Sequence, residues 1–166
     1  AFDYNEMSFR KLPTVENQPE GPTLAVWNAQ TLGKAKMSNL TEKQEVLRVA
    51  SSFDFLVLQE VRDASGETRD EIDISIHPDF TVRETDRKGR TSYKESMILI
   101  WNHSVFNVSD EGFFLSDPSD VFEREPYVVN ITHQNSTFTL ITAHLQPRAV
   151  DEELSELRSA LSSIEM

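Results

Sequence analysis

The chain has 166 residues, of which 38% are hydrophobic, and it contains no cysteine. This length and apolar content allow one globular domain with a modest core, and the lack of cysteine excludes a disulfide framework and a zinc–thiolate site. The formal net charge of −12 counts against a module that binds DNA or RNA only by neutralising phosphates, because that requires lysine and arginine. No apolar run of about 18 residues occurs, so the sequence predicts no membrane span.

Residues 1–22 are predicted to be an extension that precedes a domain over residues 23–166. The extension is rich in proline and lacks a period of either 2 or 3.6 residues, which is typical of an irregular segment. The chain begins with Ala1 and shows no charged-then-apolar leader. Because a mature secreted protein has lost its leader, this start is compatible with secretion.

The first predicted elements alternate between strand and helix. Residues 23–28 and 55–60 read as buried strands, since both are short apolar runs. A helix is expected over 41–52, where Thr41-x-x-Gln44 resembles a capping box and the apolar residues share one face. This strand–helix–strand order predicts an α/β fold with the helix packed on a sheet.

Four further strands and one helix are predicted along the rest of the chain. The helix covers about residues 150–165, where leucine and isoleucine recur at helical spacing up to the last residues. The strand candidates are residues 80–84, 96–101, 127–133 and 137–144.

Polar side chains stand at the ends of three predicted strands. Asn28, Glu60 and His144 each close an apolar run, and Glu95 stands at the start of another. Because sheets deliver catalytic groups to one rim, these four side chains are expected to converge. Asparagine and glutamate oxygens suit Mg²⁺ or Ca²⁺, and a histidine held by a carboxylate is a natural general acid or base.

Each of these residues also has a purely structural interpretation. An asparagine at a strand end commonly forms a turn. Glu60 stands near Arg62 and Asp63, so it fits a solvated charge cluster equally well. A single histidine at a strand end, such as His144, is often a hydrogen-bonded structural residue. No position decides between these interpretations alone.

Several literal runs of residues, read together, resemble the deoxyribonuclease I branch of the endonuclease/exonuclease/phosphatase superfamily. Their order and rough spacing match that family from about residue 24 to the end. The runs are Trp27-Asn28-x-x-Thr31-x-Gly33, Lys36-Met37-Ser38-Asn39-x-Thr41, Leu58-Gln59-Glu60-Val61-Arg62-Asp63, Gly89-Arg90-x-Ser92-Tyr93-Lys94-Glu95, Phe122-x-Arg124-Glu125-Pro126 and His144-x-x-Pro147.

The resemblance implies a fold and a catalytic centre. The fold is the first half of a two-sheet α/β sandwich. Asn28 and Glu60 match positions that help to hold the catalytic metal, Mg²⁺. Glu95 and His144 match a carboxylate–imidazole pair of the acid/base machinery at the scissile phosphate.

The resemblance also implies duplex DNA as the substrate. Arg62, Tyr93 and Arg124 match positions that contact the DNA backbone or the minor groove, which suits cleavage with weak sequence preference. Asn39 matches a position that is glycosylated in family members. It is one of five Asn-x-Ser/Thr sequons, a number that favours a secreted glycoprotein.

Other positions match less completely. Asp120, Phe122 and Glu125 match part of a structural Ca²⁺ loop, although the cysteines found nearby in the family are absent. Gln30 stands where family members often carry an arginine facing DNA. The segment between residues 63 and 93 does not resemble the actin-binding surface of the family, so actin binding is not carried over.

The largest departure is at the carboxyl end. The family continues with a Gly-Asp-x-Asn strand and a Ser-Asp-His turn, neither of which occurs in these 166 residues. The chain alone is therefore expected to be inactive, to expose the inner apolar face of its sheet, and to pair with a complementary C-terminal half or another chain. Two alternatives remain open: a non-catalytic structural or interaction subunit, and a phosphoesterase acting on another substrate such as a phospholipid.

Overall fold

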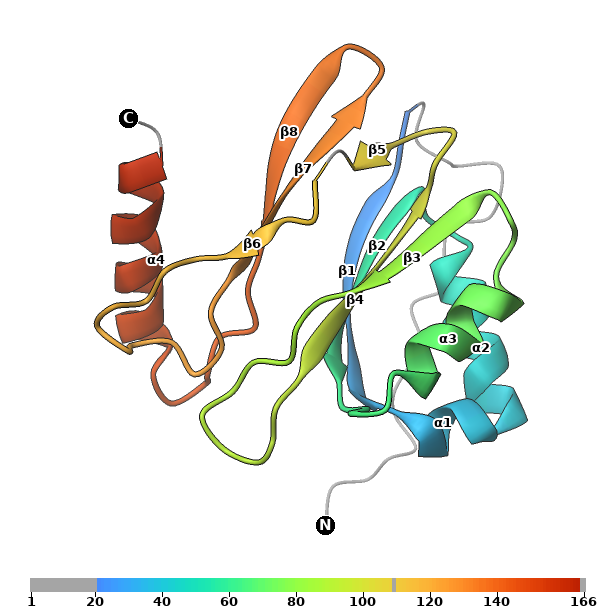
Figure 1. Cartoon of the computed structure of the whole chain (residues 1–166), viewed down its shortest axis with the longest axis horizontal. Helices are drawn as coiled ribbons and strands as arrows, with labels where there is room; N and C mark the ends of the chain where they lie inside the picture. The colour runs from blue at the N-terminus through green and yellow to red at the C-terminus, as the bar shows by residue number, and fades with distance from the viewer. Residues whose placement is uncertain (1–20, 109, 165–166) are drawn as a thin grey trace, which may run out of the picture.

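The structure is a computed structural model and describes residues 21–108 and 110–164. Two β-sheets lie at its centre, and the helices stand on opposite sides of them (Figure 1). None of the helices in the described part of the chain is long and apolar enough to cross a membrane. Nearly all of the predicted extension, residues 1–20, lies outside the described residues.

The first sheet has the strand order β1-β2-β4-β3. Its central strands β2 and β4 are antiparallel to each other, β1 runs parallel to β2, and β3 is antiparallel to β4. The strands are β1 (Leu24–Leu32), β2 (Phe55–Val61), β3 (Phe80–Glu84) and β4 (Ser96–Asn102). All four were predicted, but β1 continues four residues beyond its expected end at Asn28.

Three helices accompany this sheet: α1 (Lys34–Ser38), α2 (Leu40–Ala50) and α3 (Glu67–Ser75). Only α2 was predicted, and its expected capping box at Thr41 is wrong. The helix begins one residue earlier, because the Asn39 side chain accepts hydrogen bonds from the backbone N–H groups of Thr41 (3.0 Å) and Glu42 (3.3 Å). Asparagine is among the strongest N-cap residues.

Both faces of the central strands β2 and β4 of the first sheet are buried. On one face, alternate residues of β2 and β4 pack against apolar residues of the helices, among them Leu56, Leu58, Ile98, Ile100, Val46, Ala50 and Ile72. The other face packs against the second sheet. Strands buried on both sides read as continuous apolar runs, which is why the sequence predicted these two so closely.

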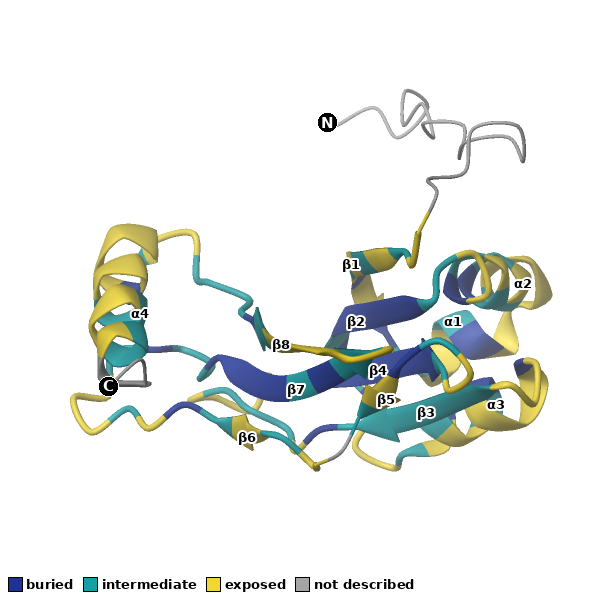
Figure 2. Cartoon of the chain, turned by 90° about the horizontal axis from the view of Figure 1, so that it is seen from above, coloured by how far each residue is buried: buried dark blue, intermediate teal, exposed yellow. Residues whose placement is uncertain are grey.

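The second sheet is built around β7 (Tyr127–His133). It pairs antiparallel with β5 (Asn107–Val108), β6 (Phe113–Phe114) and β8 (Ser136–Thr142). Helix α4 (Val150–Ile164) follows and stands at the end of the molecule opposite α1–α3 (Figures 1 and 2). The core between the sheets contains Phe55, Val57, Leu99, Trp101, Phe106, Tyr127, Val129 and Ile131.

The outer strands β1 and β8 leave apolar side chains exposed. Leu24 and Val26 are 43% and 49% exposed, and Phe138 is 53% exposed. Their register partners Phe55, Val57 and Ile131 belong to the core between the sheets, so the exposed residues lie on the inner faces. Figure 2 shows the exposed surface of β8 beside the buried strand β7. The expected exposure of the inner apolar face is therefore present at both outer strands.

Candidate active site

The site begins at an irregularity between β1 and β2. Asn28 pairs with Gln59 and Leu32 with Val61, so four residues of β1 span the same distance as two of β2. Such bulges re-aim side chains and are common beside active sites. Gln30, Thr31 and Glu60 all have positive φ angles, of 50°, 62° and 60°. This conformation is strained for residues other than glycine, by about 1–3 kcal/mol each.

Hydrogen bonds across the bulge hold Asn28 and Glu60 together. The Nδ2 of Asn28 donates to Oε1 of Glu60 at 2.7 Å, while its Oδ1 accepts from the backbone N–H of Gln30 at 2.9 Å. The other carboxylate oxygen of Glu60 accepts from the N–H of Thr31 at 3.0 Å. The two predicted metal ligands are therefore brought into direct contact.

Lys36 stabilises the same bulge and was not predicted to have a role. Its Nζ donates to the backbone carbonyls of Ala29 (2.8 Å) and Gln30 (2.5 Å). These carbonyls lie within the bulge, where the lysine satisfies them as hydrogen-bond acceptors. The only sequence signal was the lysine of the Lys-Met-Ser-Asn run.

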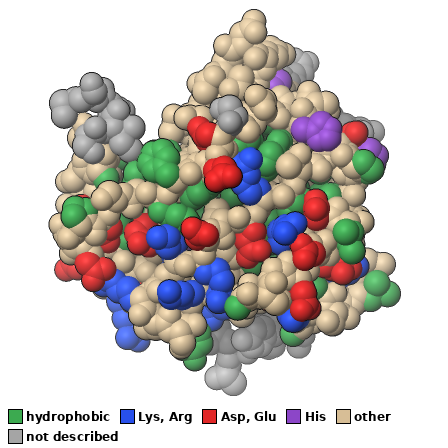
Figure 3. Space-filling view, in the orientation of Figure 1, with side chains coloured by type: hydrophobic (Ala, Val, Ile, Leu, Met, Phe, Trp, Pro, Cys, Tyr) green, Lys and Arg blue, Asp and Glu red, His purple; other side chains and the backbone are tan. Residues whose placement is uncertain are grey.

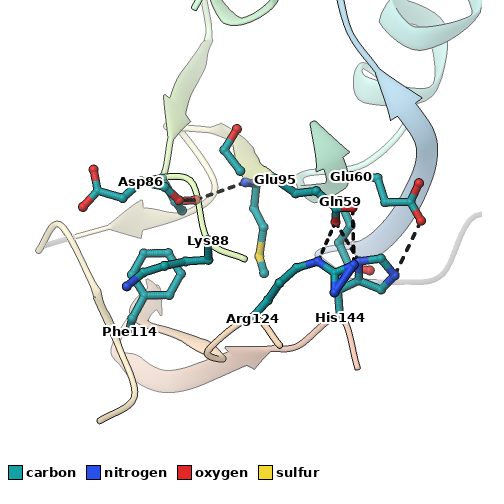
Figure 4. Close-up of a pocket in the computed structure, with 11 residues that line it drawn as sticks. Gln59, Glu60, Asp86, Lys88, Glu95, Phe114, Arg124 and His144 are labelled. Carbon is teal, nitrogen blue, oxygen red and sulfur yellow. Dashed lines mark hydrogen bonds and ion pairs between the residues drawn. The ribbon is translucent and has the colours of Figure 1, made fainter. Parts of the chain in front are cut away.

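Glu95 is the centre of the site. It immediately precedes β4, and its side chain is only 3% exposed. Arg62 donates to Oε1 at 2.7 Å, and Arg124 donates to Oε2 at 2.9 Å. The Nδ1 atom of His144 lies 2.9 Å from the same Oε2. Four segments that are distant in sequence thus meet at one carboxylate. Figure 4 shows Arg124 and His144 beside Glu95.

The surroundings of Glu95 determine its charge. Burial raises its pKa, but the hydrogen bonds from Arg62, His144 and Arg124 outweigh burial and hold the pKa below its ordinary value. The carboxylate is therefore ionised and can only accept hydrogen bonds. It follows that Nδ1 of His144 carries the hydrogen, which leaves Nε2 to exchange a proton. That Nε2 lies 3.5 Å from Oε1 of Glu60, on the opposite side of the ring (Figure 4).

His144 reaches this place because a buried glutamine fastens the end of β8. Gln59, 8% exposed, donates from Nε2 to Oγ1 of Thr142 (3.1 Å) and to the carbonyl of Ala143 (3.0 Å). It thereby links the first sheet to the residue that precedes His144. No role was predicted for Gln59, although a polar residue inside an apolar run was a usable signal.

The predicted DNA-contacting residues differ in how far their side chains are exposed and already engaged in ion pairs. Both Arg62 and Arg124 use their guanidinium groups on Glu95, and Nη1 of Arg124 is buried without a partner among the described residues. Tyr93 is 69% exposed and lies under the Arg62 guanidinium, 5.4 Å from ring centroid to Cζ. Tyr93 and one face of Arg62 are therefore the parts that a ligand can reach.

The predicted calcium residues are not brought together. The carboxylate of Asp120 pairs with Arg90 at 3.2 Å, and that of Glu125 lies 3.4 Å from Lys88. Phe122 is buried, and its backbone N–H is bound by Asp117. The described side chains thus form ion pairs here instead of a ring of oxygen ligands.

The residues at the rim provide a partial metal-binding set. No group of three or more histidine, aspartate, glutamate or cysteine side chains that could hold a metal occurs within residues 21–108 and 110–164. Glu60 supplies one carboxylate, and Asn28 one amide oxygen. This set fits Mg²⁺, which is usually held by one or two carboxylates with the remaining positions taken by water and substrate phosphate.

Charge is mixed over the face of the molecule that Figure 3 draws. Figure 3 shows acidic and basic side chains interspersed across the middle of the molecule, without one continuous basic patch. Glu95 offsets one of the two positive charges that Arg62 and Arg124 bring to the site. Attraction of a polyanion to the site therefore depends on a few local cations, as the net charge of −12 indicated.

Comparison with known proteins agrees with this geometry. No protein-family model matches the chain. It is 30% identical over 145 residues to deoxyribonuclease-1 of Rattus norvegicus, which covers 81% of the chain and 51% of that relative. It is 31% identical over 143 residues to a deoxyribonuclease of Thioalkalivibrio sp. (strain K90mix), and the match covers 81% of this chain and 39% of that relative. The chain thus spans about half the length of its deoxyribonuclease-1 relatives.

Solved structures with the same fold have diverged further in sequence. TDP2 of D. rerio, complexed with a single strand DNA product, matches with a TM-score of 0.63 at 16% identity and covers 89% of this chain and 56% of that one. An endonuclease/exonuclease/phosphatase family protein from Bacteroides thetaiotaomicron matches with a TM-score of 0.53 at 16% identity, covering 84% and 58%. These likenesses confirm the predicted two-sheet α/β fold.

Proposed function

Because the chain is homologous to deoxyribonuclease-1 over 81% of its length, we propose that it is the N-terminal portion of a metal-dependent endonuclease. The reaction is hydrolysis of phosphodiester bonds in double-stranded DNA. The homologues support a nuclease or phosphodiesterase function in general. The choice of DNA rests on the names of these relatives, and the choice of the duplex form rests on the residues that resemble the family.

One observation carries the proposal: His144, Arg62 and Arg124 converge on the buried carboxylate of Glu95. A histidine oriented by a carboxylate is suited to move a proton during hydrolysis. Guanidinium groups match the geometry and charge of a phosphate. A structural scaffold needs none of these groups at a strand end, so their convergence favours catalysis over a purely structural role.

A divalent metal and further protein groups complete the proposed chemistry. When bound, Mg²⁺ polarises the phosphate oxygens and offsets their charge, and Asn28 and Glu60 are the residues that would hold it. Ca²⁺ is proposed as a structural ion, and its binding by Asp120 and Glu125 would require their ion pairs with Arg90 and Lys88 to open. Hydrolysis also requires an activated water and a protonated leaving oxygen. We propose that a complementary C-terminal segment or chain supplies the groups for these steps.

Plasmid nicking tests the proposal. Supercoiled plasmid is incubated in Mg²⁺ and Ca²⁺, with and without EDTA. Two samples are compared: this 166-residue chain, and the natural species, which is the protein or complex containing this chain as purified from its natural source. The intact mass of the natural species is measured. The natural species is expected to nick the plasmid only without EDTA, and this chain alone is expected to be at least 10²-fold slower because acid/base groups are missing from it.

Each result of that assay is decisive. Nicking by the natural species that resists EDTA contradicts metal dependence, and equal activity of the chain alone contradicts the need for a complementary part. A natural species of stable composition that cleaves no DNA favours the alternative, a non-catalytic half-fold serving as an interaction subunit. The exposed inner residues of β1 and β8 are the observation that keeps this alternative open.

Secretion and glycosylation at Asn39 form part of the same proposal. Asn39 is exposed, and only its Oδ1 is used to cap α2, so its Nδ2 can carry a glycan. Asn39→Asp keeps a strong N-cap but removes the sequon. In cells that secrete the protein, this variant is expected to lose the mass of one glycan while its melting temperature after deglycosylation stays the same. An unchanged mass would show that Asn39 is not modified.

A further inference from the structure

Glu153 is a buried carboxylate that the proposed chemistry does not use. It lies in the first turn of α4 and is 1% exposed. No lysine, arginine or histidine side chain among the described residues forms an ion pair with it. An ionised group that is buried without a counter-charge is costly unless hydrogen bonds satisfy it, so its contacts reveal what it does.

Both oxygens of Glu153 bind backbone N–H groups of loops outside its helix. Oε1 accepts from the N–H of Glu123 at 2.7 Å, and Oε2 accepts from the N–H of Gln146, also at 2.7 Å. Short hydrogen bonds to a charged acceptor are the stronger kind. The N-terminal end of α4 adds a favourable field for a negative charge. One side chain thus joins two loops that are 23 residues apart in sequence.

Each of these loops delivers a residue to the site. Glu123 immediately precedes Arg124, and Gln146 is two residues beyond His144. Arg124 and His144 meet again at Oε2 of Glu95, each at 2.9 Å. The two loops are therefore fastened at two points, by Glu95 inside the site and by Glu153 behind it.

We propose that Glu153 is a positioning residue that sets the separation of the Arg124 and His144 loops, and so the hydrogen bond between His144 and Glu95. A glutamine cannot replace it, because one of its two terminal atoms is an NH₂ group that would face a backbone N–H. The inference rests on the proposed function only in treating His144 as the acid/base group.

The histidine side chains provide a direct readout that does not depend on DNA cleavage. In the 166-residue chain labelled with ¹⁵N-histidine, the Nδ1–H of His144 is held by Glu95, and that of His133 by the carbonyl of Val105 at 3.0 Å. His133 therefore serves as an internal reference. In Glu153→Gln, the Nδ1–H of His144 is expected to exchange with water at least about tenfold faster, while that of His133 is unchanged.

Two further variants make the result decisive. Glu152→Gln removes the same charge from the same turn at an exposed position and is expected to leave both histidines unchanged. Glu153→Asp keeps both acceptors at a shorter reach, so it is expected to fold even if Glu153→Gln does not, with the same selective effect on His144.

Unchanged exchange at His144, or equal acceleration at both histidines, would overturn the positioning role. A failed nicking assay would instead count against the nuclease proposal and leave this measurement intact.

Discussion

Replacing His144 with alanine is expected to lower the rate at which the natural, complete form of the protein nicks plasmid DNA by about 10²–10⁴-fold, the usual contribution of a general acid or base. The loss should fall on kcat and spare KM, because the ring is oriented by Glu95 and contributes proton transfer more than ground-state binding. The measurement is a time course of supercoiled plasmid converted to open circles over a range of DNA concentrations.

The matched control for this variant is His77→Ala. His77 is 65% exposed on its side chain, and its ion-pair partner is Asp79 in the same loop, so its loss should leave the nicking rate unchanged. A loss in His144→Ala no larger than in the control would show that the imidazole is not part of the acid/base machinery. A rise in KM with unchanged kcat would assign His144 to DNA binding.

The strands that were predicted well are those with an unambiguous burial pattern. Strands β2 and β4 are buried on both faces and read as apolar runs. Helix α3 was missed because its apolar residues suggest the wrong period: Ile72, Ile74 and Ile76 alternate as in a strand. In the structure Ile74 is 78% exposed, while Ile72 and Ile76 are buried. Tertiary contacts form this helix against its local pattern, as often happens with weak propensity.

The ends of the predicted helices and the shortest strands show a second limit. Strands β5 and β6 have two residues each, too few for any periodicity to register. The cap of α2 was misplaced because Thr41 and Asn39 both suit an N-cap. Which of the two residues caps α2 depends on where α1 ends, and α1 was not predicted from the sequence.

Some residues of the site were predicted from the sequence and others were not. Glu95, His144, Asn28 and Glu60 were predicted to converge, because strand ends and the start of an antiparallel neighbour share one rim of a sheet. The residues that hold them in place were not predicted. Glu153 and its partners lie far apart in sequence, and their hydrogen bonds run to backbone N–H groups, which leave no trace in residue identity.

Substituting Glu95 with glutamine is expected to lower the free energy of unfolding of the chain by about 3 kcal/mol at pH 7, in the range for breaking a buried ion pair by removing one partner. Arg124 is only 16% exposed on its side chain, and its charge would lose its counter-ion. Chemical denaturation with urea measures the difference. Glu67→Gln, which removes an exposed partner of Lys34, is the control and should change stability little.

A group retained for catalysis at the expense of stability gives the opposite result, since its removal commonly stabilises a protein. Neutral or increased stability in Glu95→Gln would mean that the buried carboxylate is retained for the reaction at a cost in stability. A loss of stability would mean that the same carboxylate both orients His144 and holds the two arginine segments of the fold together.

The pH dependence of this loss follows from the charge of Glu95. Burial raises its pKa, but the hydrogen bonds from Arg62, His144 and Arg124 hold the folded-state value below the ordinary one. The stabilisation that Glu95 provides is therefore fully present when the pH is above the pKa of glutamate in the unfolded chain, about 4.3. It is lost as the pH falls through the lower pKa that Glu95 has in the folded chain. The difference between the wild type and Glu95→Gln should be constant above about pH 5 and shrink below about pH 4. A difference that stays constant into acid would assign the loss to packing and not to charge.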